Sequence, residues 1–229
     1  TVASVGLTQG DQRIAEICSP RELRHGSGLL PLIDKLFQIS GRELDDIDCI
    51  GVVVGPGSFS GLRVAIATAK GVGYSLSKKV IAISTLAALG QTVPSSFGRT
   101  RVMLDARGGE VYWATFDYQR NGSIVRITDD ALDGIEKVLM LEKSSAVLFC
   151  ETEEGYDSII HQIGRRRSCL LSFGRLSPLA VVVAMLARKM LKTGDATKLG
   201  EMVPQYLRKS YAEKSTDLKG RPRHRGSAT

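Results

Sequence analysis

The sequence of 229 residues predicts an α/β protein made of two similar lobes, and three observations support this prediction. An apolar run at 49–54 is typical of a buried strand, and it leads through a glycine turn into a helix over 62–76. A turn-rich stretch at 93–98 then separates this half from a second series of strands and helices. Each half opens with an antiparallel hairpin or meander and continues with alternating helices and strands. We therefore expect lobes over 1–98 and 99–215, each with a mixed sheet flanked by helices.

The first half begins with two alternating segments, 2–7 and 13–18, on either side of a Gln9-Gly10-Asp11 turn, which predicts a hairpin. A helix is predicted over 27–39, and its apolar residues cover more than one face. Such a helix usually has a second partner besides the core of its own lobe. A strand at 80–83 follows the glycine-turn helix, and Ser84 and Thr85 then cap a short helix that ends near residue 91.

The second half is predicted to form three strands, over 101–106, 111–118 and 124–127, joined by glycine turns. A helix over 135–141, a strand over 146–150, a helix over 156–163 and a strand over 169–172 come next. A longer helix over 177–192 is terminated by Gly194. Residues 216–229 are predicted to be a basic, disordered tail.

Charge and cysteine content restrict the classes of function. Seven basic and two acidic residues between 208 and 229 give this end +5 of the net charge of +7. Such an end attracts RNA phosphates in a salt-dependent way, but a solvated tail is the simpler interpretation. The four cysteines are far apart, which disfavours a disulfide framework or a zinc site and fits a cytoplasmic protein. The longest apolar run, 179–186, is too short to span a membrane.

The turn between the buried strand and its helix is a candidate phosphate-binding site. Backbone N–H groups and the helix dipole converge there, which favours an anion. The G-x-G-x-x-x-G spacing matches neither the dinucleotide fingerprint nor the Walker loop. A close-packed turn that requires glycine is the alternative. The residues concerned are Gly55, Gly57, Ser58, Ser60, Gly61 and Arg63.

Four segments of this sequence resemble segments of the TsaB (YeaZ) family and occur in the family's order. The resemblance extends to about residue 215. They are GPGSFSGLRVAIATAKG at 55–71, His25 with LLPLI at 29–33, MLDARGGEVY at 103–112, and PQYLR at 204–208. The resemblance implies the two-lobed actin-like ATPase fold of Hsp70 and the sugar kinases. It also implies a non-catalytic partner that binds and activates a TsaD-like threonylcarbamoyl transferase, which makes N6-threonylcarbamoyladenosine next to the tRNA anticodon. A TsaE-like ATPase would be the third component, tRNA contact would be indirect, and the chain alone would form a homodimer.

In TsaB relatives, the helices that correspond to 27–39 and 62–76 form the interface with TsaD or with a second copy. A ridge of small residues at four-residue steps lets another backbone approach, and bulky residues fill the opposing groove. The alternative is that both helices simply pack inside their own lobe. The expected interface residues are His25, Leu29, Leu30, Ile33, Leu36, Phe37, Ala65, Ala69 and Gly73.

No residue is expected to be catalytic. The first strand of the family ends in Asp-Thr-Ser, which this sequence lacks, so we expect that strand to be truncated or shortened. His25 has no second histidine four residues on, where Leu29 stands, so no metal site is expected. Asp105 and Glu110 flank a glycine turn and are candidate cleft carboxylates, unless Asp105 merely braces the turn.

The alternative function is an actin-like ATPase or phosphotransferase that binds nucleotide at the Gly55–Arg63 turn. As a non-catalytic partner of a TsaD-like transferase, this chain is expected to require no cofactor. ATP or ADP would bind at that turn or at the interface of the complex.

Overall fold

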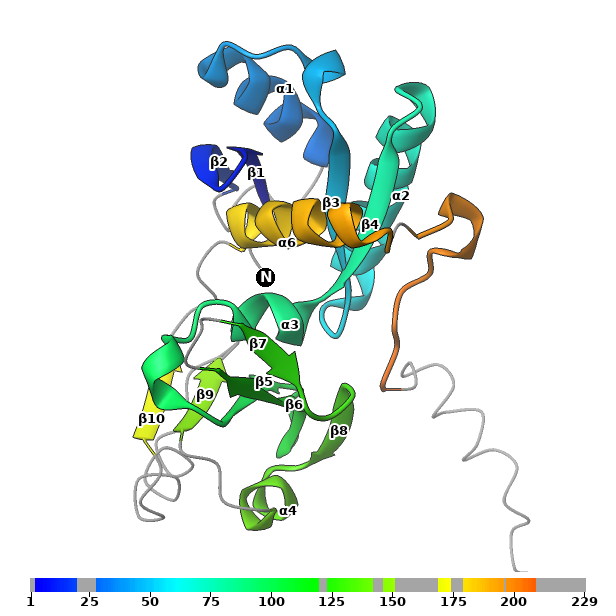
Figure 1. Ribbon diagram of the computed structural model, residues 1–229. Helices are drawn as coiled ribbons and strands as arrows, with labels where there is room; N and C mark the ends of the chain where they lie inside the picture. The colour runs from blue at the N-terminus through cyan, green and yellow to red at the C-terminus, as the bar shows by residue number, and fades with distance from the viewer. Residues whose placement is uncertain are drawn as a thin grey trace, which may run out of the picture.

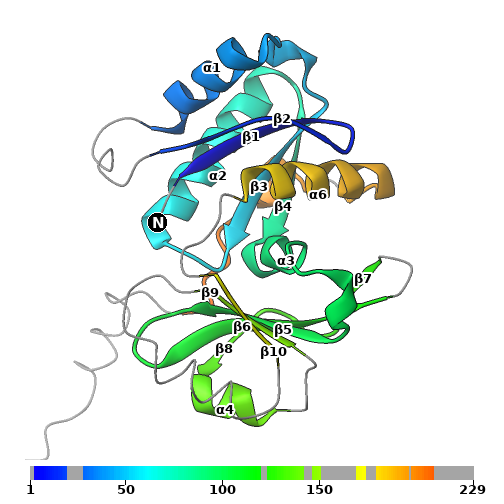
Figure 2. The same cartoon turned by 90° about the vertical axis from the view of Figure 1, so that its left-hand side faces the viewer.

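The computed structural model describes residues 3–19, 28–119, 123–141, 146–150, 169–173, 179–195 and 197–208. The elements form two lobes in Figures 1 and 2, with β1–β4, α1, α2 and α6 in the upper lobe and β5–β10 and α4 in the lower lobe. The prediction of a mixed α/β fold is confirmed. His25, the predicted helix over 156–163 and the tail over 216–229 lie outside the described residues.

In the part of the upper lobe that the structure describes, the strands form two separate pairs. Strands β1 (Ser4–Gln9) and β2 (Gln12–Cys18) form the predicted antiparallel hairpin. Strands β3 (Cys49–Gly55) and β4 (Lys79–Ser84) are parallel and are joined by helix α2 (Phe59–Ser75). Helix α1 (Leu29–Ser40) packs on the hairpin and also contacts α2, and the short 3₁₀ turn η2 (Leu44–Asp46) leads from it to β3.

Helix α6 (Ala180–Thr193) lies across the strands of the upper lobe, although the sequence placed it in a lobe over 99–215. Two glycines permit this approach. A Cβ at Gly51 would lie 2.8 Å from the Ala187 Cβ, and a Cβ at Gly6 would lie 2.8 Å from the backbone nitrogen of Val181. The apolar periodicity of α6 predicts a helix, but it does not say which sheet the helix covers.

The lower lobe contains a mixed sheet with the strand order β10-β9-β5-β6-β7, and β8 pairs with the first part of β6 while β7 pairs with its last part. Strands β5 (Thr100–Asp105), β6 (Glu110–Tyr118) and β7 (Ile124–Arg126) are antiparallel, whereas β9 (Ala146–Cys150) runs parallel to β5 and to β10 (Cys169–Phe173). The four-residue strand β8 (Ala131–Gly134) was not predicted, because it is short and has no clear alternation. Helix α4 (Ile135–Met140) follows it directly.

Helix α3 (Thr85–Gly90) joins the lobes. Its Leu86 and Leu89 are buried in a cluster with Val102 and Phe116 of the lower sheet, while Ala88 belongs to a cluster with Ile81 of β4. As predicted, Ser84 caps this helix, and its Oγ accepts a hydrogen bond from the Ala87 N–H at 3.2 Å.

Ser84 also links the lobes through polar contacts. Its hydroxyl donates to Asp130 at 2.7 Å and accepts a hydrogen bond from Arg126 at 3.0 Å. The predicted linker at 93–98 is packed rather than extended, because Val93 is buried and Phe97, in the 3₁₀ turn η3 (Ser95–Phe97), contacts the same apolar cluster. A third 3₁₀ turn, η4 (Leu199–Glu201), precedes the last described segment.

We predict that Gly51→Ala lowers the free energy of unfolding by about 1–3 kcal/mol, because the new methyl group overpacks the contact between β3 and α6. Gly71→Ala is the matched control, since nothing lies within 4 Å of a Cβ at that exposed helical position. The control should raise the free energy of unfolding by about 0.5–1 kcal/mol. Urea unfolding followed by circular dichroism measures both changes, and equal stability of the two variants would contradict the close contact.

Candidate functional site

The strand-to-helix turn at 55–63 is built around one required glycine and one helix cap. Gly55 has φ of 134°, and a Cβ there would lie 2.7 Å from the Gln205 carbonyl oxygen. Ser58, rather than Gly61, precedes the first helical residue, and its Oγ accepts a hydrogen bond from the Gly61 N–H at 3.4 Å. Gly57 has no comparable steric requirement. The alternative of a close-packed turn therefore explains Gly55.

Arg63, which was expected to complete an anion site, is engaged by aromatic residues. Its Nε donates to the Tyr206 hydroxyl at 3.0 Å, and its guanidinium carbon lies 4.0 Å from the centre of the Phe59 ring. Phe59 and Tyr206 stack with their ring centres 4.8 Å apart. What remains for an anion is the exposed first turn of α2 with Ser58 and Ser60, and a helix N-terminus alone does not define a site.

The two candidate carboxylates at the β5–β6 turn are held by the protein itself. Asp105 is buried, and its Oδ1 accepts a hydrogen bond from the Arg107 N–H at 2.7 Å, so it braces the turn. Glu110 forms an ion pair with Arg208. The guanidinium of Arg208 also donates to the carbonyl oxygens of Ala106 at 2.6 Å and Arg107 at 3.2 Å.

The electrostatics of this turn follow from the same contacts. Burial raises the pKa of the Tyr112 phenol on β6, and the charges of Glu110 and Asp105 add to that rise while the nearby Arg208 opposes it. Tyr112 therefore stays neutral at physiological pH. The turn is a braced structural feature in which both carboxylates have partners within the chain.

The small-residue ridge on α2 faces inward, which corrects its expected place at a partner interface. Ala69 is buried in a cluster with Val52 and Val80, and a Cβ at Gly73 would lie 2.5 Å from the Val80 Cγ2 atom. Ala65 packs against the same cluster. The four-residue spacing therefore serves the close approach of α2 to its own β3–β4 pair. On α1, Leu36 is likewise buried, at 3% exposure.

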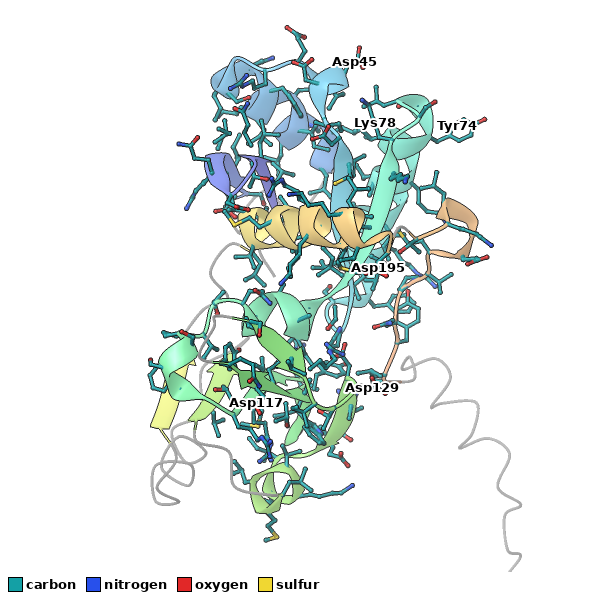
Figure 3. All side chains as sticks on the ribbon, viewed as in Figure 1. Asp45, Tyr74, Lys78, Asp117, Asp129 and Asp195 are labelled. Atoms are coloured by element: carbon teal, nitrogen blue, oxygen red, sulfur yellow. The ribbon has the colours of Figure 1, made fainter. Side chains whose placement is uncertain are left out.

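Helices α1 and α2 also carry exposed apolar side chains. Leu30 and Ile39 on α1 are 55% and 60% exposed, and Val64 and Tyr74 on α2 are 48% and 82% exposed. Figure 3 shows Tyr74 pointing away from the upper lobe. Among the other expected interface residues, Leu29, Ile33 and Phe37 are half-buried. The outer face is our name for this exposed set, Leu30, Ile39, Val64 and Tyr74; its two α1 residues are nine positions apart and so lie on opposite flanks of that helix.

Metal-binding clusters and membrane-spanning helices are both absent from the described part of the chain. Within it, no three His, Cys, Asp or Glu side chains are grouped so that they could hold a metal ion. Among the helices of the same residues, none combines the length and the apolar character that a membrane span requires.

The position of the ridge makes a prediction about stability. We expect Ala69→Glu to lower the free energy of unfolding by about 3 kcal/mol, because it places an unpaired charge in the cluster with Val52 and Val80. Ala67→Glu on the exposed face of the same helix should change stability by less than about 0.5 kcal/mol. Thermal unfolding measures the stability of both variants. An Ala69→Glu protein as stable as the original would contradict the inward position of the ridge.

Comparisons with known proteins identify relatives over most of the chain. The sequence model of a family described as TsaD, tRNA N6-adenosine threonylcarbamoyltransferase, matches residues 20–155. The tRNA threonylcarbamoyladenosine biosynthesis protein TsaB of Escherichia coli K12 is 31% identical over 202 residues, covering 87% of this chain and 86% of that protein. The protein of the same name from Bacillus subtilis 168 is 26% identical over 218 residues, covering 91% of this chain and 90% of that protein.

Two solved structures are also similar. A Pseudomonas aeruginosa protein described as uncharacterized, with similarity to peptidase YEAZ, superposes with a TM-score of 0.73 at 27% identity, covering 90% of this chain and 94% of the other. YeaZ from Pseudomonas aeruginosa superposes with a TM-score of 0.70 at 26% identity and the same coverage. These matches confirm the resemblance that the sequence motifs indicated, and the chain belongs to the TsaB (YeaZ) family.

Proposed function

We propose that this chain is a non-catalytic subunit in tRNA threonylcarbamoyladenosine biosynthesis that binds and activates a TsaD-like threonylcarbamoyltransferase. The relatives that carry the name of this biosynthesis match over most of their length, and the matching family model is described as the transferase. In this proposal the partner performs the transfer next to the anticodon, and a TsaE-like ATPase completes the cytoplasmic complex. The tRNA contacts this chain only indirectly.

The observation that carries the proposal is the outer face of the two neighbouring helices α1 and α2. Leu30, Ile39, Val64 and Tyr74 leave large apolar surfaces in water while small residues face the core. Burying one such side chain completely stabilises a complex by about 1.5–3 kcal/mol before the costs of association. Contiguous exposed apolar patches are typical of surfaces that bind another protein, and in this proposal the exposed residues of α1 and α2 contribute to one. In this proposal the partner therefore binds the outer face and not the small-residue ridge of α2.

The arrangement of the carboxylates supports a structural role for this chain. A general acid or base must reach a substrate proton, whereas Asp105 braces its own turn and Glu110 pairs with Arg208. The finer fold assignment, a two-lobed actin-like ATPase (ASKHA, Hsp70 and sugar-kinase type) architecture, belongs to the same proposal. The family membership and the division into two lobes support it.

We predict that Val64→Glu weakens the complex with the TsaD homologue of the same organism by about tenfold or more, because a charge would be buried in the interface. Val125→Glu on β7 is the matched control, since Val125 is 45% exposed on the lower lobe, compared with 48% for Val64. The control should bind like the original protein. Size-exclusion chromatography with light scattering and titration calorimetry measure stoichiometry and affinity. Equal binding by both variants, or no complex at all, would contradict the proposal.

The same outer face is proposed to pair with a second copy when the partner is absent. In a symmetric dimer both copies contribute the same surface patch, so one charged substitution places two charges in the interface. Sedimentation equilibrium of the isolated chain should therefore show a larger loss of dimer for Val64→Glu than for Val125→Glu. A monomeric original protein would remove the homodimer from the proposal and leave the heterodimer to its own test.

Nucleotide binding at the 55–63 turn remains the second candidate, supported by the exposed first turn of α2 with Ser58 and Ser60. The engagement of Arg63 by Tyr206 and Phe59 disfavours it. We therefore expect titration of the isolated chain with ATP and Mg²⁺ to show a Kd weaker than about 1 mM. A micromolar Kd that is lost in Ser58→Ala and Ser60→Ala would favour the ATPase reading.

A further inference from the structure

The segment 202–208, which we call the strap, is attached to the upper lobe at several points. Met202 is buried in the cluster of Val54 and Ile66, and its carbonyl oxygen accepts a hydrogen bond from Lys70 of α2 at 3.1 Å. The N–H of Gln205 then donates to the Val54 carbonyl oxygen at 2.7 Å, at the end of β3. Figure 1 shows this segment, in orange, descending past α2 towards the lower lobe.

Tyr206 connects the strap to the first turn of α2. Its ring stacks on Phe59, the first residue of the helix, and its hydroxyl accepts the hydrogen bond from Arg63. Arg63 also lies over the Phe59 ring, so the three side chains form one closed cluster. Val64, one of the two outer-face residues on α2, immediately follows Arg63 in the sequence. These contacts therefore link the position of the strap to the position of the first turn of α2.

Arg208 connects the strap to the lower lobe. Its guanidinium donates to two carbonyl oxygens of the β5–β6 turn and pairs with Glu110. The planar guanidinium fork of an arginine, bonded to several acceptors, fixes the orientation of its side chain better than the point charge of a lysine does. The Arg208 side chain is only 20% exposed, and its Nε has no hydrogen-bond partner within the described chain. Such a partly desolvated guanidinium is held by this one set of acceptors.

We propose that the strap fixes the first turn of α2 relative to the β5–β6 turn, and that Arg208 is a positioning residue for the partner-binding outer face. Among the described residues, helix α3, Leu179 and the Ser84–Asp130 contact join the lobes at one place, and the strap joins them at a second place. Two separate connections define the relative orientation of two bodies far better than one. The consequence for partner binding rests on the proposed function, whereas the coupling within the chain does not.

Hydrogen exchange measured by mass spectrometry on Arg208→Ala tests the coupling in the isolated full chain. We expect exchange to rise about tenfold in the strap and in the first turn of α2, because a charge-assisted anchor is lost. Exchange in the β1–β2 hairpin should not change, which separates local release from global destabilisation. Arg99→Ala is the matched control, since Arg99 pairs with Asp117 at 3.5 Å within the lower lobe. Unchanged exchange of the strap in Arg208→Ala would overturn the proposal.

Two milder variants keep the test decisive if Arg208→Ala folds poorly. Arg208→Lys retains the charge without the fork, and Glu110→Gln retains an acceptor without the charge. Both should give exchange in the strap between that of the original protein and that of Arg208→Ala. Full protection of the strap in both variants would contradict the role of the fork and the ion pair.

Partner affinity is measured on the same variants. Arg208→Ala should weaken binding of the TsaD homologue about threefold to tenfold with the outer face intact, whereas Arg99→Ala should not. Faster exchange with unchanged affinity would overturn the positioning role of Arg208. If the original protein binds no TsaD homologue, the proposed function fails, and the exchange experiment still decides whether the strap couples the two turns.

Discussion

The close approach of two helices to the β3–β4 pair is the constraint on which the upper lobe depends. On one side α2 reaches the strands because Gly73 leaves room for Val80, and on the other side α6 reaches them because Gly51 leaves room for Ala187. A layer of only two strands has little surface of its own, so contact on both faces supplies its core. The small residues of α2 must therefore face inward. The larger apolar residues, Val64 and Tyr74, are left on the outside.

Much of the fold could be predicted from local signals. Strand β9 has the predicted bounds, and the predicted capping of α3 by Ser84 is confirmed, because an N-cap serine acts within its own turn. Helix α2 begins three residues before the predicted start at 62, because Ser58 caps the helix and Gly61 lies within its first turn. The position of α6 could not be predicted, since it depends on contacts with Gly6 and Gly51, far away in the sequence.

The candidate site was less predictable, for a related reason. Four-residue spacing identified the face that contains Ala65, Ala69 and Gly73, but spacing alone does not distinguish a face turned towards the protein's own sheet from one turned towards a partner. The hydrogen-bond partner of Arg63 and the ion-pair partner of Glu110 lie in the segment 204–208, about a hundred residues or more away. The family motif PQYLR marked that segment, although no local rule indicated what its tyrosine and arginine would contact.

The position of α3 has a consequence for how the chain folds and can be divided. Leu86 and Leu89 are part of the lower core, while Ala88, on the same short helix, is part of the core beneath α6. Loss of packing in either lobe therefore removes support from the other, which favours a single cooperative unfolding transition. A fragment that ends at the predicted boundary of residue 98 would keep the two leucines without the strands that bury them. A short helix shared by two apolar cores thus links the stability of one lobe to that of the other.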